Sequence, residues 1–201
     1  MNISIFQYGA VIFLDDCHGI GVSGATGQGT EEYFGMEGAA DILVGTLGKA
    51  FGSMGGVVAG KQNCIDLLAR TSRTFVFSTS LTPATVGTSL KALDLLVENP
   101  SILTKLQDNT LRFRQGMETL GYEVKGTDHP CCPVMIRDDT LTWKVSDFLF
   151  KNGVLASWIV VPVCAPGQQK LRIIIKASHS LDDIDKLLGL FRSAKETILY
   201  K

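Results

Sequence analysis

The chain has 201 residues, 45% of them hydrophobic and 19% charged, and its formal net charge is −1 at pH 7. This is ordinary globular composition, enough for one large domain or two small ones. The charge balance argues against nucleic-acid binding. The longest apolar runs are strand-sized, far below the roughly 20 residues of a membrane helix. The first residues lack the basic and apolar pattern of a secretory signal.

In the first half, a short apolar run over residues 9–16, ending in two acids, predicts a strand buried on both faces, as in the centre of a parallel sheet. A glycine-rich, turn-like stretch follows over 17–38. Further strands are expected at 41–45, 55–59 and 74–78, and helices at 62–71 and 83–97. This alternation of strands and helices indicates an α/β domain over residues 1–100.

A break at Glu98-Asn99-Pro100 separates the second half, residues 101–201. Helical periodicity runs over 101–120 and ends at Gly121, and further helices are expected at 142–152 and 181–197. Strands are expected at 133–136 and 171–175. This half therefore reads as a small α+β domain. Because a central strand lies so near the start, we expect the chain to be the C-terminal part of a longer protein.

Five cysteines occur at positions 17, 64, 131, 132 and 164. Their odd number, irregular spacing and lack of a C-x-x-C pair indicate neither a disulfide framework nor a zinc site, and no metal site is expected. The pattern is typical of reduced thiols in an intracellular compartment.

Two glycine-rich segments resemble nucleotide-binding motifs. In both, the neighbouring residues argue against a nucleotide site. Gly19–Gly24 matches G-x-G-x-x-G, but the glycines that follow disfavour the helix whose N-terminus would bind a pyrophosphate. Gly45–Lys49 has too few residues between its glycines for a phosphate loop, and Ala50 stands where that loop needs Ser or Thr.

Lys49 lies among small residues that leave room for a bulky planar partner. Asp15 ends the first strand, His18 follows three residues later, and Thr46 precedes the lysine by three. A carboxylate, an imidazole, a hydroxyl and a lysine amine are the groups that hold pyridoxal 5′-phosphate (PLP). The alternative is a surface lysine on a flexible loop.

Three motifs, in order, resemble the α-oxoamine synthase family of fold-type I PLP enzymes, which join an amino acid to an acyl-CoA. They are Asp15-Asp16-Cys17-His18-Gly19, the stretch 45–52 (GTLGKAFG) and the stretch 77–81 (FSTSL). The resemblance extends through Asp128–Met135, Leu171-Arg172 and His179. It implies an α/β fold of PLP-dependent transferase type I, with part of the large domain, containing a mixed or parallel sheet, followed by the small C-terminal domain.

The resemblance implies a role for each matched residue in holding the cofactor. Lys49 would form the Schiff base with PLP and act as the catalytic base, and Asp15 would pair with the pyridine nitrogen. Asp16 would point to the opposite face of the strand. His18 would hydrogen-bond the phenolic oxygen of the cofactor, and Thr46 would bind its phosphate.

The remaining roles concern the substrate and a second subunit. Ser78 and Thr79 match residues that reach the phosphate of the partner subunit's cofactor, so a homodimer with shared active sites is expected; the alternative is a polar turn before a helix near Pro83. Arg172 matches the arginine that clamps the substrate carboxylate. His129 and His179 are interpreted as structural.

Within the family, the chain is most similar to the glycine C-acetyltransferases (2-amino-3-ketobutyrate CoA ligases), on the stretches 91–96 and 129–135. The implied reaction makes 2-amino-3-oxobutanoate from glycine and acetyl-CoA, or runs in reverse in threonine catabolism, in the cytoplasm or mitochondria. Alternatives in the family use alanine with a pimeloyl thioester, glycine with succinyl-CoA, or serine with palmitoyl-CoA. A non-catalytic paralogue acting as a dimer partner is a further alternative.

Some residues depart from the acetyltransferase pattern. Trp158 replaces a small residue and is expected to narrow or reshape the mouth of the site. Val161 replaces an aromatic residue, Ala165-Pro166 replaces Pro-Lys, and Ile173 stands where a hydroxyl residue is common. The histidine that stacks on the cofactor ring in the family has no counterpart in this sequence. These departures affect the assignment of the substrate more than the assignment of the cofactor.

Overall fold

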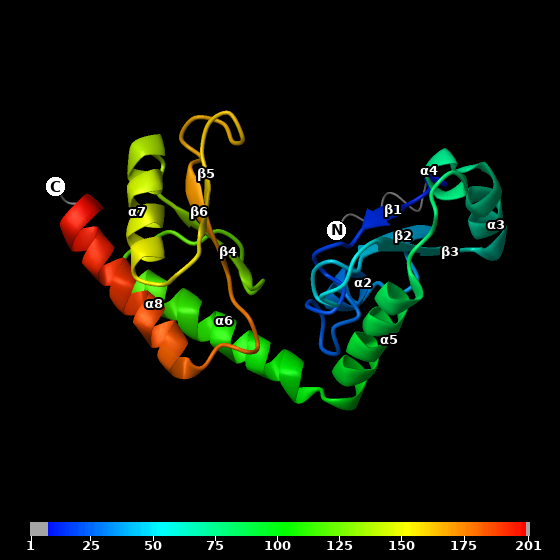
Figure 1. Ribbon diagram of the computed structural model, residues 1–201, viewed down its shortest axis with the longest axis horizontal. Helices are drawn as coiled ribbons and strands as arrows, with labels where there is room; N and C mark the ends of the chain where they lie inside the picture. Colours follow the sequence, from blue (N-terminus) through cyan, green and yellow to red (C-terminus); the bar gives the residue numbers. More distant parts are fainter. Residues whose placement is uncertain (1–7, 200–201) are drawn as a thin grey trace. The chain divides into compact units, whose positions relative to one another are not determined.

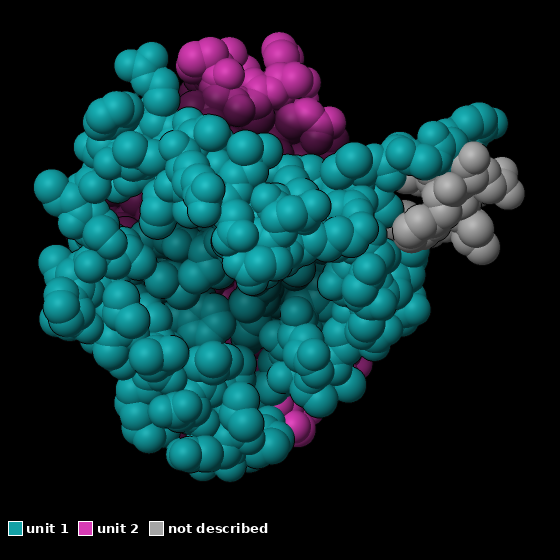
Figure 2. All heavy atoms as spheres, turned by 90° about the vertical axis from the view of Figure 1, so that its right-hand side faces the viewer, with its two compact units in different colours: residues 1–103 teal, residues 104–201 magenta. Residues whose placement is uncertain are grey.

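The computed structural model describes residues 8–199, which form two compact units, Met1–Leu103 (unit 1) and Thr104–Lys201 (unit 2) (Figures 1 and 2). The boundary falls within one helix, α6 (Ser101–Thr119). None of the described helices is both long and apolar enough to cross a lipid bilayer.

Unit 1 contains a three-stranded sheet in the order β1-β2-β3. β1 (Phe13–Asp15) pairs in parallel with β2 (Ile42–Thr46), and β2 pairs antiparallel with β3 (Gly56–Gly60). The sheet is therefore mixed. The helices of this unit are α2 (Thr30–Phe34), α3 (Gln62–Thr71), α4 (Arg73–Val76) and α5 (Pro83–Glu98).

Two expectations for unit 1 are wrong. The first strand is short, and its burial pattern is not that of a central strand, because 64% of Phe13 is exposed and β1 forms one edge of the described sheet. Residues 74–78, expected as a strand, lie in α4 and the turn after it. Their apolar, β-branched composition favours a strand, but no described strand pairs with them.

Unit 2 contains a second three-stranded sheet in the order β4-β6-β5, all antiparallel. Its strands are β4 (Cys131–Met135), β5 (Ser157–Ile159) and β6 (Lys170–Ile174). α7 (Asp139–Lys151) and α8 (Leu181–Ala194) complete the unit together with α6, and a π-helical turn (Lys195–Leu199) follows α8. β5 was not expected from the sequence, because three residues are too few to show a periodic pattern.

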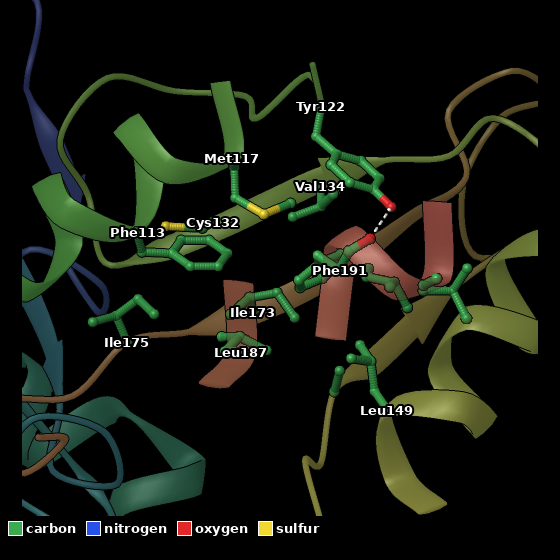
Figure 3. Packing of buried hydrophobic residues seen from close by; sticks show 14 of the residues in the cluster. Phe113, Met117, Tyr122, Cys132, Val134, Leu149, Ile173, Ile175, Leu187 and Phe191 are labelled. Atoms are coloured by element: carbon green, nitrogen blue, oxygen red, sulfur yellow. Dashed lines mark hydrogen bonds between the residues drawn. The ribbon is translucent and has the colours of Figure 1, made fainter. Parts of the chain in front are cut away.

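The core of unit 2 lies between one face of this sheet and its three helices (Figure 3). Phe113 from α6, Leu149 from α7 and Phe191 from α8 are fully buried there, against residues such as Val134 and Leu171 of the sheet. The hydroxyl of Tyr122 donates to the Phe191 carbonyl oxygen at 2.9 Å. An antiparallel sheet with helices on one face is the α+β arrangement that was expected for this half.

Candidate active site

The ends of β1 and β2 bring Asp15 and the Lys49 turn into the same part of unit 1. Asp15 is the last residue of β1 and lies opposite Val44 of β2 in the parallel pair. β2 ends at Thr46, and the turn that carries Lys49 follows at once. Parallel strands end at the same edge of a sheet, so both side chains project from that edge.

The turn containing His18 packs directly on the Lys49 turn. A Cβ atom added at Gly45 would lie 2.5 Å from Cδ1 of Ile20, and one added at Gly21 would lie 2.6 Å from Cβ of Ala50. At Gly21, where φ is 76°, a side chain would meet the rigid Cβ of Ala50, and at Gly45 it would displace the terminal methyl of Ile20. The two glycines therefore hold the segment after β1 against the residues on both sides of Lys49.

The segment after α4 reaches the other side of the Lys49 turn. The side chain of Leu81 lies against Gly55, where a Cβ would be 2.5 Å from a Leu81 methyl carbon. The hydroxyl of Ser53 donates to the Thr85 carbonyl oxygen at 3.0 Å. Unit 1 thus brings all three motif segments together around Lys49.

The Lys49 turn is internally bonded and open to solvent. The Thr46 hydroxyl donates to the Gly55 carbonyl oxygen at 3.2 Å and accepts from the Gly48 amide at 3.3 Å. Lys49 is exposed, and a Cβ at Gly52 would meet no atom within 4 Å. The Lys49 side chain is therefore accessible from solvent.

Asp15 is exposed, whereas the sequence suggested a buried carboxylate. Its Oδ1 accepts from the Cys17 amide at 3.1 Å, which closes a turn at the end of β1. Hydrogen bonds from the Cys17 side chain and amide lower the pKa of Asp15, and the positive charges of Lys49 and His18 lower it further. The carboxylate, amine and imidazole therefore lie close enough to influence one another.

Asp16, the neighbouring acid, is buried and has a structural role. Its carboxylate accepts from the Thr30 amide at 2.8 Å and from the Thr30 hydroxyl, and so binds the start of α2. A Cβ at Gly19 or at Gly29 would lie 2.0 Å from an Asp16 carboxylate oxygen. Asp16 and Asp15 thus have different surroundings, although they are adjacent.

Close packing explains why glycines occur in the glycine-rich loop, which the sequence alone did not reveal. Besides Asp16, the Glu32 carboxylate closes the loop, because it accepts from the amides of Thr26 and Gln28. A Cβ at Gly24 would meet Glu32 at 2.1 Å. The next helix begins only at Thr30, so no helix N-terminus opens at Gly24, in agreement with the argument against a dinucleotide site.

Ser78 and Thr79 lie in the exposed turn after α4. The Ser78 hydroxyl donates to the Phe75 carbonyl oxygen at 3.1 Å, and Ser80 has a φ of 66°. α5 then begins at Pro83, with the Thr82 hydroxyl accepting from the Thr85 amide at 3.3 Å. The local structure is a polar turn before a helix, and any contact with a partner's cofactor remains a prediction.

Arg172 lies in unit 2, on the central strand β6. It is exposed, while its neighbours Leu171 and Ile173 point into the core. β6 pairs Arg172 with Ser157 and Leu171 with Trp158. Directly paired residues share a face, so Trp158 projects from the face opposite Arg172, with 50% of its side chain exposed. Its effect on the mouth of the site stays a prediction.

The two other histidines bind local backbone. His129 Nδ1 accepts from the Cys131 amide at 3.0 Å, and His179 Nδ1 accepts from the Lys176 amide at 3.2 Å. Partial burial lowers the pKa of His179. These contacts support the structural interpretation of both residues.

The comparisons with known proteins identify the family. The family model for aminotransferase class I and II matches residues 3–191. The chain belongs to this family, in its α-oxoamine synthase group. It is 42% identical over 186 residues to the mitochondrial 2-amino-3-ketobutyrate coenzyme A ligase of Mus musculus, which covers 92% of this chain and 45% of that protein.

Other relatives are named as enzymes that catalyse different reactions. The 8-amino-7-oxononanoate synthase of Petrotoga mobilis is 39% identical over 192 residues, covering 96% of this chain and 49% of that protein. A serine palmitoyltransferase structure from Sphingomonas wittichii superposes with a TM-score of 0.92 at 27% identity, over 98% of this chain and 50% of that one. A similar structure, with a TM-score of 0.92, is described as SPT with a PLP internal aldimine.

The fold is therefore the α/β fold of the fold-type I PLP enzymes. The chain spans about half the length of the curated relatives that it matches. The identities to the ligase and the synthase are so similar that they leave the substrate open.

Proposed function

We propose that this chain binds PLP through Lys49 and forms part of an acyl-CoA:glycine C-acyltransferase, which condenses glycine with acetyl-CoA to 2-amino-3-oxobutanoate and CoA or runs the reverse reaction. The observation that carries the proposal is the arrangement of two strand ends: Asp15 closes β1, and the turn that carries Lys49 directly follows β2, the parallel neighbour of β1. Hydrogen bonds from Cys17 are the main cause of the lowered pKa of Asp15, and the charge of Lys49 lowers it further. Lys49 and Asp15 are both exposed, so both side chains are accessible to a cofactor. The 42% identity to the mouse ligase supports glycine as the amino acid.

When bound, PLP supplies an electron sink for the charge that develops at the α-carbon of the amino acid. The Lys49 amine would hold the cofactor through its aldehyde and, once glycine has displaced it, would take the α-proton.

Asp15 would accept a hydrogen bond from the pyridine N–H and keep that nitrogen protonated. Its lowered pKa keeps the carboxylate charged over the physiological range, as this role requires. His18 would donate to the phenolic oxygen, and Thr46 would bind the phosphate, as would Ser78 and Thr79 for the cofactor of a second subunit. Arg172 would hold the glycine carboxylate by two parallel hydrogen bonds.

The proposal is tested by visible absorbance after PLP is added to the purified full chain. The carbon–nitrogen link between the lysine amine and the PLP aldehyde colours the protein yellow, so the wild type should gain the band and Lys49→Ala should not. Lys61→Ala is the matched control, because Lys61 is also an exposed lysine of unit 1, paired only with Asp41 at 3.4 Å. A band that survives in Lys49→Ala would refute the proposal.

A second candidate, 8-amino-7-oxononanoate synthesis, is favoured by the 39% identity to the Petrotoga enzyme. Its amino acid would be alanine instead of glycine. Titrating the PLP-loaded chain with glycine, alanine and serine separates the candidates, because the amino acid that is used should change the absorbance at the lowest concentration. Glycine should act first if the acetyltransferase proposal is correct.

A further inference from the structure

The sheet of unit 2 has a second face, opposite its core, that carries Arg172. The register of β4, β6 and β5 puts Pro133, Arg172 and Ser157 in one row across this face. Cys131 lies opposite Ile174 in the next row, again on this face. Side chains that are directly paired across antiparallel strands have Cβ atoms about 4.5–5.5 Å apart, so the Ser157 hydroxyl and the Arg172 side chain are neighbours.

Both polar groups are available to a ligand. Ser157 and Arg172 are exposed, and neither side chain has a hydrogen-bond partner among residues 8–199. Lys170, two residues before Arg172 on the same face, forms no ion pair within that range either. The face therefore presents hydrogen-bond donors and positive charge, and no ion pair within residues 8–199 neutralises Arg172 or Lys170.

The acid on this side of the sheet already has partners. Glu123 lies in the segment that pairs with the outer edge of β4, where the Met135 amide donates to the Glu123 carbonyl oxygen at 2.9 Å. Its carboxylate forms ion pairs with Lys125 at 2.6 Å and with Arg137. Glu123 is thus occupied, and the charges of Arg172 and Lys170 are left to attract an anion.

We propose that Ser157 is a second ligand for the carboxylate of the amino-acid substrate, donating its hydroxyl proton to the oxygen that Arg172 leaves available. This inference rests on the proposed role of Arg172 and adds a binding residue to it. A guanidinium and a neighbouring hydroxyl together fix a carboxylate in orientation as well as position, because three hydrogen bonds meet two oxygens. Lys170 would contribute charge without direct contact.

Cys131 provides a probe of this face that needs neither cofactor nor turnover. Burial raises the pKa of the Cys131 thiol, and the charge of Arg172 acts in the opposite direction. A carboxylate bound at Arg172 would cancel that charge, reduce the thiolate fraction and slow alkylation of Cys131. Peptide masses separate Cys131 and Cys132 from the other three cysteines, and fragmentation of their shared peptide in the mass spectrometer separates Cys131 from Cys132.

The experiment measures alkylation of Cys131 in the full chain, without PLP, at rising glycine concentration. Glycine should slow the reaction in the wild type and have no effect in Arg172→Ala. Ser157→Ala should need about three- to tenfold more glycine for the same protection, which is the range expected for the net contribution of one ordinary hydrogen bond. Ser157→Thr keeps the hydroxyl and should restore the wild-type response.

Ser193→Ala is the matched control, because Ser193 is an exposed serine of unit 2 whose hydroxyl donates only to the Gly189 carbonyl oxygen of its own helix. If protection is lost in Arg172→Ala but unchanged in Ser157→Ala, the proposed role of Ser157 is wrong and that of Arg172 is retained. No protection in the wild type would overturn both. Because PLP is absent, failure of Lys49 to bind the cofactor would not affect the result.

Discussion

The two units contain apolar side chains of the same kinds but bury them very differently. The core cluster of fifteen buried residues lies entirely in unit 2, where three helices cover one face of the sheet. Among residues 8–199, the buried hydrophobic side chains of unit 1 are only Leu47 and Leu103. Phe13, Phe75 and Phe77 of unit 1 are all more than half exposed.

The packed core that stabilises the fold and most of the proposed cofactor-binding residues therefore lie in different units. Unit 2 has the packing that lets a domain hold its own fold, and its contribution to the proposed reaction comes from the uncovered face of its sheet. Unit 1 has few buried contacts, and its described structure depends on hydrogen bonds and close glycine packing around Asp16 and Lys49. Substitutions in the two units should therefore have different consequences.

The largest expected effect is on the core of unit 2. Phe191→Ala removes a fully buried ring that packs on Phe113 and Tyr122, and should lower the free energy of unfolding by about 3–5 kcal/mol. Trp143 and Trp158, the two tryptophans of the chain, both belong to unit 2, so their fluorescence during urea unfolding reports on this unit.

Phe77→Ala is the matched control in unit 1, where 80% of the side chain is exposed, and it should change the free energy of unfolding by no more than about 0.5 kcal/mol. Equal losses in the two variants would remove the contrast between the units.

A second effect should appear in alkaline solution. Burial raises the pKa of Cys132 to about 11, against about 9.0 for an unburied thiol. The thiol ionises first in the unfolded chain, so unit 2 should lose about 1.4 kcal/mol of stability per pH unit as the pH rises from about 9 to about 11. Cys132→Val should flatten this dependence, measured by urea unfolding at several pH values. An unchanged slope in Cys132→Val would show that another group is responsible.

The adjacent acids of unit 1 provide a third test. Asp16→Ala removes the buried acceptor of the Thr30 amide and hydroxyl, and should destabilise the loop and α2 by about 1–3 kcal/mol. Hydrogen exchange of the Thr30 amide measures this loss. Asp15→Ala should leave that exchange almost unchanged but weaken PLP binding. The reverse pattern would mean that the roles of the two acids have been exchanged.

The smallest effect concerns a helix cap in unit 2. The Ser180 hydroxyl accepts from the Asp183 amide at 3.1 Å, and the Asp183 carboxylate accepts from the Ser180 amide at 2.9 Å. Ser180→Ala should therefore cost about 1 kcal/mol of unfolding free energy. Ser180→Asn retains a capping side chain and should recover most of it. A loss of unfolding free energy as large as that in Phe191→Ala would mean that Ser180 stabilises more of unit 2 than the first turn of α8.

The sequence predicted the helices well where amphipathic spacing and end signals agreed. Residues 62–71 form α3 with the expected bounds, and the helix expected over 83–97 is α5. The failures arise where long-range pairing decides the structure. The β-branched residues near Thr74 resemble a strand, yet without a pairing partner in the described chain they form α4.

For the candidate site, the motifs indicated which residues to consider but not their surroundings. The exposure of Asp15 and the burial of Asp16 depend on packing against Thr30 and Gly29, far along the chain from either acid. Ser157 was missed altogether, because only the register of β5 and β6 reveals that it faces Arg172 while Trp158 projects from the opposite face.

The proposed function depends most on Lys49 as the residue that binds the cofactor. The most direct measurement is borohydride reduction of the PLP-loaded full chain, followed by peptide mass mapping of all its lysines. We expect one stable phosphopyridoxyl adduct, on the peptide that contains Lys49. An adduct on Lys61 or another lysine, with Lys49 unmodified, would contradict the proposed function.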